Sequence, residues 1–285
     1  MPSMVAEDGR GGLEGLCEAA SAIARIRMGP GCTGIERLKA RFPGRAFAPH
    51  RHDTYAIGIT LAGVQTFRYR GMMRHCLPGQ CHVLHPDELH DGAAGTDAGF
   101  AYRITYLDPA LVQEALGGRL LPFVAEPVTP LSDTQQTSLA PAWNLGGTLD
   151  EANRTDLVVA IADLLAAASG GPTGASALDM PALWKIRRRL PADPVTWPTA
   201  IALERLSGLD RWTLSRQFRA AFGTSPSRFR TMRQLDRARR LIASGMPLAA
   251  AEAEAEAGFA DQSHLSRRFK RTYGLTPGRW ATALA

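Results

Sequence analysis

The sequence predicts an α+β protein with an antiparallel β-barrel of the jelly-roll type in its N-terminal part, a helical connector, and an all-α C-terminal part. Three observations predict this class. Apolar and polar residues alternate between Ala46 and Tyr106, helical periodicity dominates after Leu183, and a glycine-rich stretch over 169–181 separates the two patterns. A chain of 285 residues, 45% of them hydrophobic, has enough material for two domains.

The composition argues against several classes of protein. The longest apolar stretch, Leu157–Ala168, is interrupted by Asp163 and is shorter than the ~20 residues that a membrane-spanning helix needs. The N-terminus has no basic cluster followed by an apolar segment, so we expect no secretion signal and a cytoplasmic location. The 4 cysteines are too few and too irregularly spaced for a disulfide scaffold or a zinc site, and we expect reduced thiols.

Strands are expected in the N-terminal part. Residues 1–40 are predicted to form an N-terminal arm, and residues 41–130 the barrel. Apolar residues at every second position predict a first strand: Tyr55, Ile57, Ile59 and Leu61. A second strand, Phe67–Arg70, follows a turn at Gly63, and turn residues divide the rest of the segment into further short strands. This spacing is typical of a small antiparallel barrel.

Residues 131–168 are predicted to form the helical connector. An amphipathic helix over about Glu151 to Ala168 carries an apolar stripe, made of Leu157, Ile161, Leu164 and Leu165. The stripe suits either the core of the chain or a contact with a second copy, and we expect a homodimer. Residues 169–181 then form a linker.

The charge is divided unequally between the two parts. From Leu183 onward there are 19 Lys+Arg against 8 Asp+Glu, a net charge of +11, and the preceding residues carry −5 of the total of +6. Of the 19 basic residues, 17 are arginine, whose planar fork suits phosphate and guanine. Because eight acids within this part cannot pair nineteen bases, the excess charge indicates a nucleic-acid partner.

The C-terminal part contains the same helical phrase twice. Gly208 and Gly258 each precede a helix that is predicted to begin three residues later, and the apolar pair Leu214 and Phe218 recurs as Leu265 and Phe269. Each copy is therefore predicted to be a helix-turn-helix. An amphipathic helix, roughly Pro226 to Ala243, joins the two copies. The second helix of each copy turns a polar face outward, made of Arg211, Trp212, Ser215, Arg216 and Arg219, then of Gln262, Ser263, His264, Arg267 and Lys270.

The C-terminal part resembles the DNA-binding domain of the AraC/XylS family of bacterial transcription regulators. The resemblance covers essentially all of 183–285, and its most specific part is the run Gly258–Pro277, supported by Gly223–Pro226 and Arg237–Leu241. It implies a DNA-binding domain over 182–285, with helix-turn-helix units at about 198–222 and 248–273 whose second helices enter successive major-groove segments.

The same resemblance assigns contacts to individual residues. It implies base contacts for Trp212, Ser215 and Arg216, and for Ser263, His264 and Arg267; Arg219, Lys270 and Arg271 would lie nearer phosphates. Alternatives stay open: Arg216 and Arg267 contact only phosphate, Trp212 belongs partly to the core, or Ser263 chiefly caps its helix. The Ala-Glu run over 248–257 is about two residues longer than in the family. Either the helix gains half a turn, or Glu254 comes near the core.

The N-terminal motifs resemble the family's cupin-type sensor. They are Ala48–Tyr55, Leu77–Gly79 and His85–Asp91. The resemblance implies an effector site made of His50, His52, Tyr55 and His90. Metal-binding cupins add a glutamate after an HxH pair, but Ile57 and Gly58 occupy its region here, so only His50, His52 and His90 could bind an ion. We therefore expect no cofactor and no metal, with histidines that make hydrogen bonds or contact an organic effector.

The expected function is that of a sequence-specific transcription regulator that responds to a small molecule and has no enzymatic activity. Its partners would be double-stranded promoter DNA, the effector, a second copy of the chain and, as a further candidate, RNA polymerase. Ligand binding would shift the relation between the two parts. Two alternatives remain. One is a cupin-type metalloenzyme fused to a helical domain, and the other is an architectural basic protein without sequence preference.

Overall fold

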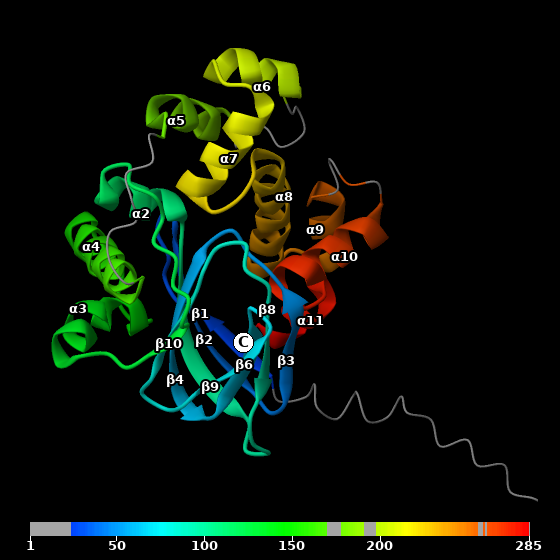
Figure 1. Ribbon diagram of the computed structural model, residues 1–285. Coiled ribbons are helices and arrows are strands. Elements are labelled where there is room, and N and C mark those ends of the chain that lie inside the picture. Colours follow the sequence, from blue (N-terminus) through cyan, green and yellow to red (C-terminus); the bar gives the residue numbers. More distant parts are fainter. Residues whose placement is uncertain (1–23, 170–177, 191–197, 256–258, 260, 285) are drawn as a thin grey trace, which may run out of the picture.

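A computed structural model of the protein describes residues 24–169, 178–190, 198–255, 259 and 261–284 (Figure 1). The predicted class is confirmed: an N-terminal antiparallel sheet domain precedes a C-terminal helical domain. The predicted barrel is corrected in one respect, because the strands form two separate sheets that do not close on each other. Most of the predicted arm (1–40) and of the predicted linker (169–181) lies outside the described residues.

The larger sheet has six strands in the order β1-β2-β9-β4-β7-β10. Their bounds are Arg25–Met28, Ile35–Phe42, Phe100–Leu107, Tyr55–Gly63, Cys81–Leu84 and Val128–Thr129. The smaller sheet has the order β3-β8-β5-β6, with bounds Arg45–His50, His90–Ala94, Gln65–Tyr69 and Met72–Cys76. β1 and most of β2 fall in the segment that the sequence assigns to an arm, and in the structure they pair within the larger sheet.

β4 differs from the prediction of a strand with one apolar face. Tyr55, Ala56 and Ile57 are all fully buried, whereas Leu61 near its end is exposed. The reason is that helices cover one face of the larger sheet, while the other face packs toward the smaller sheet and the C-terminal helices. A strand covered on both faces loses the alternation that sequence reasoning depends on.

Gly58 in β4 makes room for a buried histidine of β7. The two strands pair Gly58 with His82, and a Cβ at position 58 would lie 2.2 Å from Cε1 of the His82 ring. His82 is fully buried, and its Nδ1 lies 3.9 Å from the sulfur of Cys76. Burial lowers the pKa of His82 to about 4.

We expect His82 to make the protein less stable in acid. An unfolded histidine has a pKa of about 6.5, so between there and about pH 4 the unfolded chain binds a proton that the folded chain does not, and stability falls as pH falls. The largest contribution is about 3 kcal/mol, at about 1.4 kcal/mol per pH unit. Urea unfolding of His82→Asn should show a smaller loss of stability than wild type between about pH 7 and about pH 5. The exposed His75→Asn is the control, and equal losses in wild type and His82→Asn would contradict the assignment.

Three helices cover one face of the larger sheet (Figure 1). They are α2 (Pro109–Leu116), α3 (Asp133–Trp143) and α4 (Glu151–Ala168). One of them, α2, also packs against the helices of the C-terminal domain. α4 has the predicted bounds, and Asp150 caps its N-terminus. Its predicted apolar stripe is buried against α2, α3 and the sheet, so of the two readings the structure supports the core of the chain rather than a dimer contact.

Seven helices make up the described C-terminal domain: α5 (Met180–Arg189), α6 (Ala200–Ser207), α7 (Arg211–Phe222), α8 (Pro226–Ala243), α9 (Leu248–Ala255), α10 (Gln262–Tyr273) and α11 (Pro277–Ala283). α8 has the predicted bounds and lies between the pairs α6/α7 and α9/α10 (Figure 1). Ala251 in α9 is buried. The sequence left open whether Glu254 comes near the core, and this side chain lies outside those that the structure describes.

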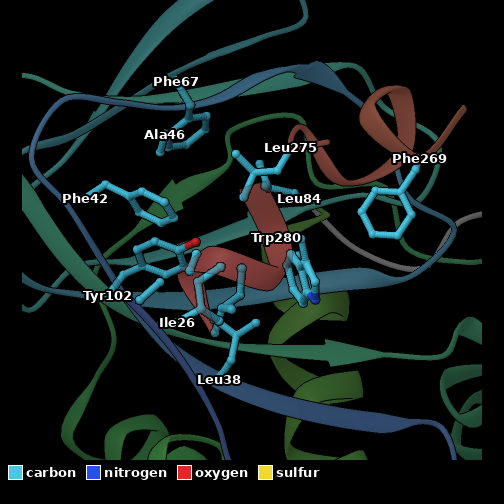
Figure 2. Packing of buried hydrophobic residues seen from close by; sticks show 14 of the residues in the cluster. Ile26, Leu38, Phe42, Ala46, Phe67, Leu84, Tyr102, Phe269, Leu275 and Trp280 are labelled. Atoms are coloured by element: carbon cyan, nitrogen blue, oxygen red, sulfur yellow. The ribbon is translucent and has the colours of Figure 1, made fainter. Parts of the chain in front are cut away.

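The two domains share one hydrophobic core. Figure 2 shows Phe42, Tyr102 and Leu38 of the strands in one cluster with Phe269 of α10, Trp280 of α11 and Leu275, which lies between these two helices. Main-chain contacts join the domains as well: Ala48 N–H donates to the carbonyl of Gly274 (3.1 Å), and Arg51 N–H donates to that of Arg271 (3.1 Å). The second helix-turn-helix unit is therefore docked on the sheets. Among the described residues no helix is long and apolar enough to cross a membrane.

Candidate functional site

The two candidate reader helices, α7 and α10, are built alike. Asp210 and Asp261 cap their N-termini, each through its carboxylate, which accepts main-chain N–H groups. Gly223 and Gly274 end them in the left-handed conformation, with φ of 73° and 72°. Their inner faces bury Leu214 and Phe218, and Leu265 and Phe269. Caps and buried pairs thus fix which face of each helix remains outside.

The outer face of α7 carries the five residues that the sequence singles out. Arg211, Arg216 and Arg219 are exposed, and Ser215 is half-buried. Trp212 is 71% exposed, which excludes the alternative that it belongs to the core. Nη2 of Arg216 donates to the Thr213 hydroxyl at 3.1 Å. An exposed tryptophan beside exposed arginines suits contact with bases and phosphates.

The outer face of α10 is the counterpart. Gln262, Ser263, Arg267 and Lys270 are exposed, and His264 is half-buried. The His264 ring lies 5.6 Å from Phe259, and its Nε2 accepts a hydrogen bond from Arg268 at 3.2 Å. The ten candidate DNA-contact residues therefore all lie on the surface or at its edge.

Arginines of the C-terminal domain also pair with acids of the N-terminal domain. Arg233 lies 2.7 Å from Asp53. Asp87 accepts a hydrogen bond from Arg219 at 3.1 Å, and its other carboxylate oxygen lies 2.7 Å from Nε of Arg228. Two further pairs across the domains are Arg187 with Asp108, and Arg239 with Glu36. The argument that acids cannot pair the basic excess holds only within the C-terminal part: five arginines find partners in the acidic N-terminal part. Arg216 and Arg267, in contrast, are exposed on the outer faces of α7 and α10.

A cavity of about 680 Å³ lies between the two domains. Its size is that of a pocket for a small organic ligand. Strands supply one wall, with Leu38, Phe47 and Tyr102, and the C-terminal helices supply the other, with Phe229, Tyr273 and Trp280. Its charged lining residues are Glu36, Asp53, Asp108, Arg187, Arg233, Asp236, Arg237, Arg239 and Arg240.

Three of the four predicted effector residues gather beside this cavity. His50 and His52 line it, and the ring of His90 lies 4.2 Å from His50 and 4.8 Å from His52. Tyr55 lies elsewhere: it is fully buried under the helices of the N-terminal domain, and its hydroxyl donates to the carbonyl of Pro122 at 2.7 Å. Burial, with the mutual proximity of the rings, lowers the pKa of His52 and of His90 to about 3.

Sequence reasoning missed the helical wall of the cavity. Arg237, Arg240 and Trp280 were not predicted to line the effector site, because the N-terminal domain alone was expected to hold the effector. The opposite charges of the two parts were the available signal, since they predict that the parts attract each other. Pairing between the domains brings the arginines of α8 over the sheets.

Comparison with known proteins agrees with this arrangement. A family model described as the AraC-like ligand binding domain matches residues 33–165, and one described as a helix-turn-helix domain matches residues 203–283. A search of curated proteins finds no match.

Solved structures with a similar fold include several of ToxT from Vibrio cholerae. One at 11% identity covers 88% of this chain and 99% of that chain, with a TM-score of 0.64. A second, bound to (E)-4-(8-methylnaphthalen-1-yl)but-3-enoic acid, has 11% identity, covers 91% and 98%, and has a TM-score of 0.62. A third, with unsaturated fatty acid bound, has 14% identity, covers 92% and 96%, and has a TM-score of 0.60. At this identity the likeness shows the fold, over nearly the whole of both chains.

Proposed function

This chain belongs to the AraC family of transcription regulators, and from that membership we propose that an acidic, largely apolar small molecule binds between its two domains. This molecule would control how the two reader helices contact promoter DNA. The observation that carries the proposal is the cavity of about 680 Å³, which both domains line. A ligand held by both domains has a different affinity for each arrangement of them, and that difference is what a regulatory ligand needs.

The lining supports the chemical class of the effector. Aromatic rings from both walls, including Tyr102 and Trp280, suit an apolar body. Arg237 and Arg240 add guanidinium groups, which bind carboxylates well. The ligands of the ToxT structures named above are carboxylic acids with apolar bodies. The predicted effector residues His50, His52 and His90 lie at one side of the cavity. Tyr55 lies away from the cavity and would not contact the effector directly.

The reader helices support the proposed DNA contacts. α7 would act through Arg211, Trp212, Ser215, Arg216 and Arg219, and α10 through Gln262, Ser263, His264, Arg267 and Lys270. The 18-residue helix α8, which joins the two units, is about 27 Å long at about 1.5 Å per residue. That length is near the ~34 Å between major-groove segments one helical turn apart on one face of a duplex.

Asp87 offers a route between effector and DNA. It lies in the segment between β7 and β8 and pairs with Arg219 of α7 and Arg228 of α8. The neighbouring Pro86 packs against Gly223, where a Cβ would come within 2.5 Å. Arg219 is a proposed phosphate contact, so the sensor domain and DNA would compete for the same guanidinium.

Oleic acid, used below its micelle concentration, is the probe for the effector. It should raise the melting temperature of the full chain by about 5 °C at about 100 times its Kd, and oleyl alcohol, which lacks the carboxylate, should raise it less. Arg240→Gln should remove the difference between acid and alcohol, whereas Arg188→Gln on α5 should keep it. Equal shifts by acid and alcohol in the wild type would refute recognition of a carboxylate. No shift with either would refute the apolar site.

Two further partners belong to the proposal. We propose that the chain acts as a homodimer, which would match repeated half-sites on DNA, and that it contacts RNA polymerase at the promoter. Because the apolar stripe of α4 is buried within the chain, a dimer would use another surface. Sedimentation equilibrium of the full chain, with and without DNA, measures the mass that decides this point.

A further inference from the structure

A groove lined by four arginines lies where the smaller sheet meets α8 and α10. Arg51 comes from the segment between β3 and β4, Arg228 from α8, and Arg268 and Arg271 from α10. We call it the arginine groove. Its volume is about 750 Å³, and none of the arginines that line the cavity between the domains lines this groove. Among the described residues that line the groove, none is acidic.

Hydrogen bonds hold the arginines of the groove in place. The N–H of Arg51 donates to the carbonyl of Arg271 at 3.1 Å, and Nη2 of Arg228 donates to the carbonyl of Arg51 at 3.2 Å. Nε of Arg268 donates to Nε2 of His264, one turn earlier on α10, at 3.2 Å. Arg51, a residue of the N-terminal domain, is therefore bound directly to both α8 and α10.

The positive charge of the groove is only partly balanced. Arg228 lies 2.7 Å from Asp87, but in the part of the chain that the structure describes neither Arg51 nor Arg271 makes an ion pair. Burial lowers the pKa of Arg228, and the nearby Arg51 guanidinium lowers it further, although Asp87 opposes the shift. Cations held this close repel each other, and an anion in the groove would offset the repulsion.

The groove extends from one reader helix to the other. Ser225 and Ser227, whose hydroxyl groups also line it, lie at the start of α8, just after the end of α7. Arg268 and Arg271 are exposed on α10. The sequence already places Arg271 near phosphates, so Arg51 lies beside an expected phosphate contact.

We propose that the arginine groove binds a backbone phosphate of the duplex between the two segments that α7 and α10 read, and that Arg51 of the N-terminal domain contacts this phosphate. The inference rests on the proposed reading of DNA by both helices. A phosphodiester is an anion whose oxygens accept hydrogen bonds from guanidinium and hydroxyl groups, and these are the donors that line the groove. Backbone phosphates separate two major-groove segments on one face of a duplex.

Arg51 would connect the effector with DNA by a second route. It lies between His50 and His52 in the sequence, and both histidines line the cavity between the domains. A ligand that shifts this segment would move a DNA contact with it. The route differs from the pairing of Asp87 with Arg219, in which the N-terminal domain competes with DNA for an arginine.

The test is the salt dependence of DNA binding by the full chain, measured by fluorescence anisotropy on specific and random duplexes. Arg51→Gln keeps the main-chain hydrogen bonds and removes one charge, so the slope of log K against log salt should become shallower by about 0.9. At about 0.1 M salt the affinity should fall roughly 5- to 10-fold, about equally on both duplexes. Arg51→Lys should keep most of the slope. Arg45→Gln is the control, because Arg45 is an exposed arginine of β3 that does not line the groove, and its slope should equal that of wild type.

A free phosphate compound is the other source of the same chemistry. Inorganic pyrophosphate is the probe for it, added at constant ionic strength to wild type and to Arg51→Gln. A higher melting temperature in wild type alone, together with unchanged DNA binding by Arg51→Gln, would assign the groove to a free phosphate and overturn the DNA contact.

Three other results separate this inference from the proposed function. Equal salt slopes in wild type and Arg51→Gln would overturn the contact of Arg51 and leave the reading of DNA by α7 and α10 intact. A loss on the specific duplex alone would also overturn it, because a phosphate contact acts on every sequence. If wild type bound neither duplex, the proposed reading of DNA would fail, and the inference would fail with it.

Discussion

Arg216→Ala and Arg267→Ala should each weaken binding to the specific DNA site by about 1–3 kcal/mol, the value of one arginine contact to a base edge. Both arginines are exposed on the outer faces of α7 and α10, one on each reader helix. The loss on random DNA should be much smaller, because non-specific binding rests on phosphate contacts. Fluorescence anisotropy with specific and random duplexes at a fixed salt concentration measures both.

The control for charge is Arg41→Ala, which removes an exposed arginine from β2 in the N-terminal domain. Its effect on both duplexes should be small. Arg219→Ala should weaken binding to the two duplexes about equally, as expected of a phosphate contact. If Arg216→Ala and Arg267→Ala also lowered the affinity for specific and random DNA equally, these two arginines would contact phosphate only. The assignment of base contacts would then be wrong.

Arg233→Met should lower the free energy of unfolding by about 3–5 kcal/mol, the usual cost of removing one partner of a buried ion pair. Arg233 donates to Asp53 of the N-terminal domain at 2.7 Å and lies 3.0 Å from Asp236 of its own helix. Asp53 is only 7% exposed, and burial raises its pKa although Arg233 opposes the shift. Without Arg233, Asp53 loses its partner and is left facing Asp236, which keeps Arg239 at 3.4 Å. Urea unfolding followed by circular dichroism measures the loss.

The matched variant is the double change Arg233→Met with Asp53→Asn. It should recover part of the stability, because it removes the uncompensated carboxylate together with its partner. A stability of Arg233→Met within about 0.5 kcal/mol of wild type would contradict the docked arrangement of the domains, since that is the usual effect of a surface change.

Local signals in the sequence predicted the helices well. The bounds of α4 and α8 follow from periodicity and from caps at Asp150 and Ser225, which act within a few residues of the helix start. The same holds for the reader helices, whose caps at Asp210 and Asp261 and terminal glycines belong to one short phrase. The exposed faces of the candidate DNA interface follow from these local rules.

The first strands could not be found by pattern. β2 contains Arg37, which is 1% exposed and therefore breaks the apolar alternation. Its guanidinium donates to the carbonyls of Pro30, Pro141, Asn144 and Gly147, at distances between 2.6 and 2.9 Å. Three of these partners are more than a hundred residues away in sequence. A buried charge satisfied by remote main-chain groups leaves no local signal.

Only one wall of the candidate effector site was predicted, because the contacts that bring in the other wall are also remote in sequence. The histidines of the HxH motif are near in sequence, and the structure brings His50, His52 and His90 together. The opposite wall comes from α8 and α11, and pairs such as Arg233–Asp53 and Arg239–Glu36 join residues 180 and 203 positions apart. Only the opposite charges of the two parts hinted at this contact.

The central claim is that α7 and α10 read one duplex together. Selection of bound sequences from a random DNA pool, carried out with wild type, Arg216→Ala and Arg267→Ala, tests it most directly. Wild type should select two blocks of preferred bases whose centres lie about one helical turn, roughly 10 base pairs, apart; Arg216→Ala should lose the preference in one block and Arg267→Ala in the other. A single block with wild type, or loss of the same block in both variants, would contradict the claim.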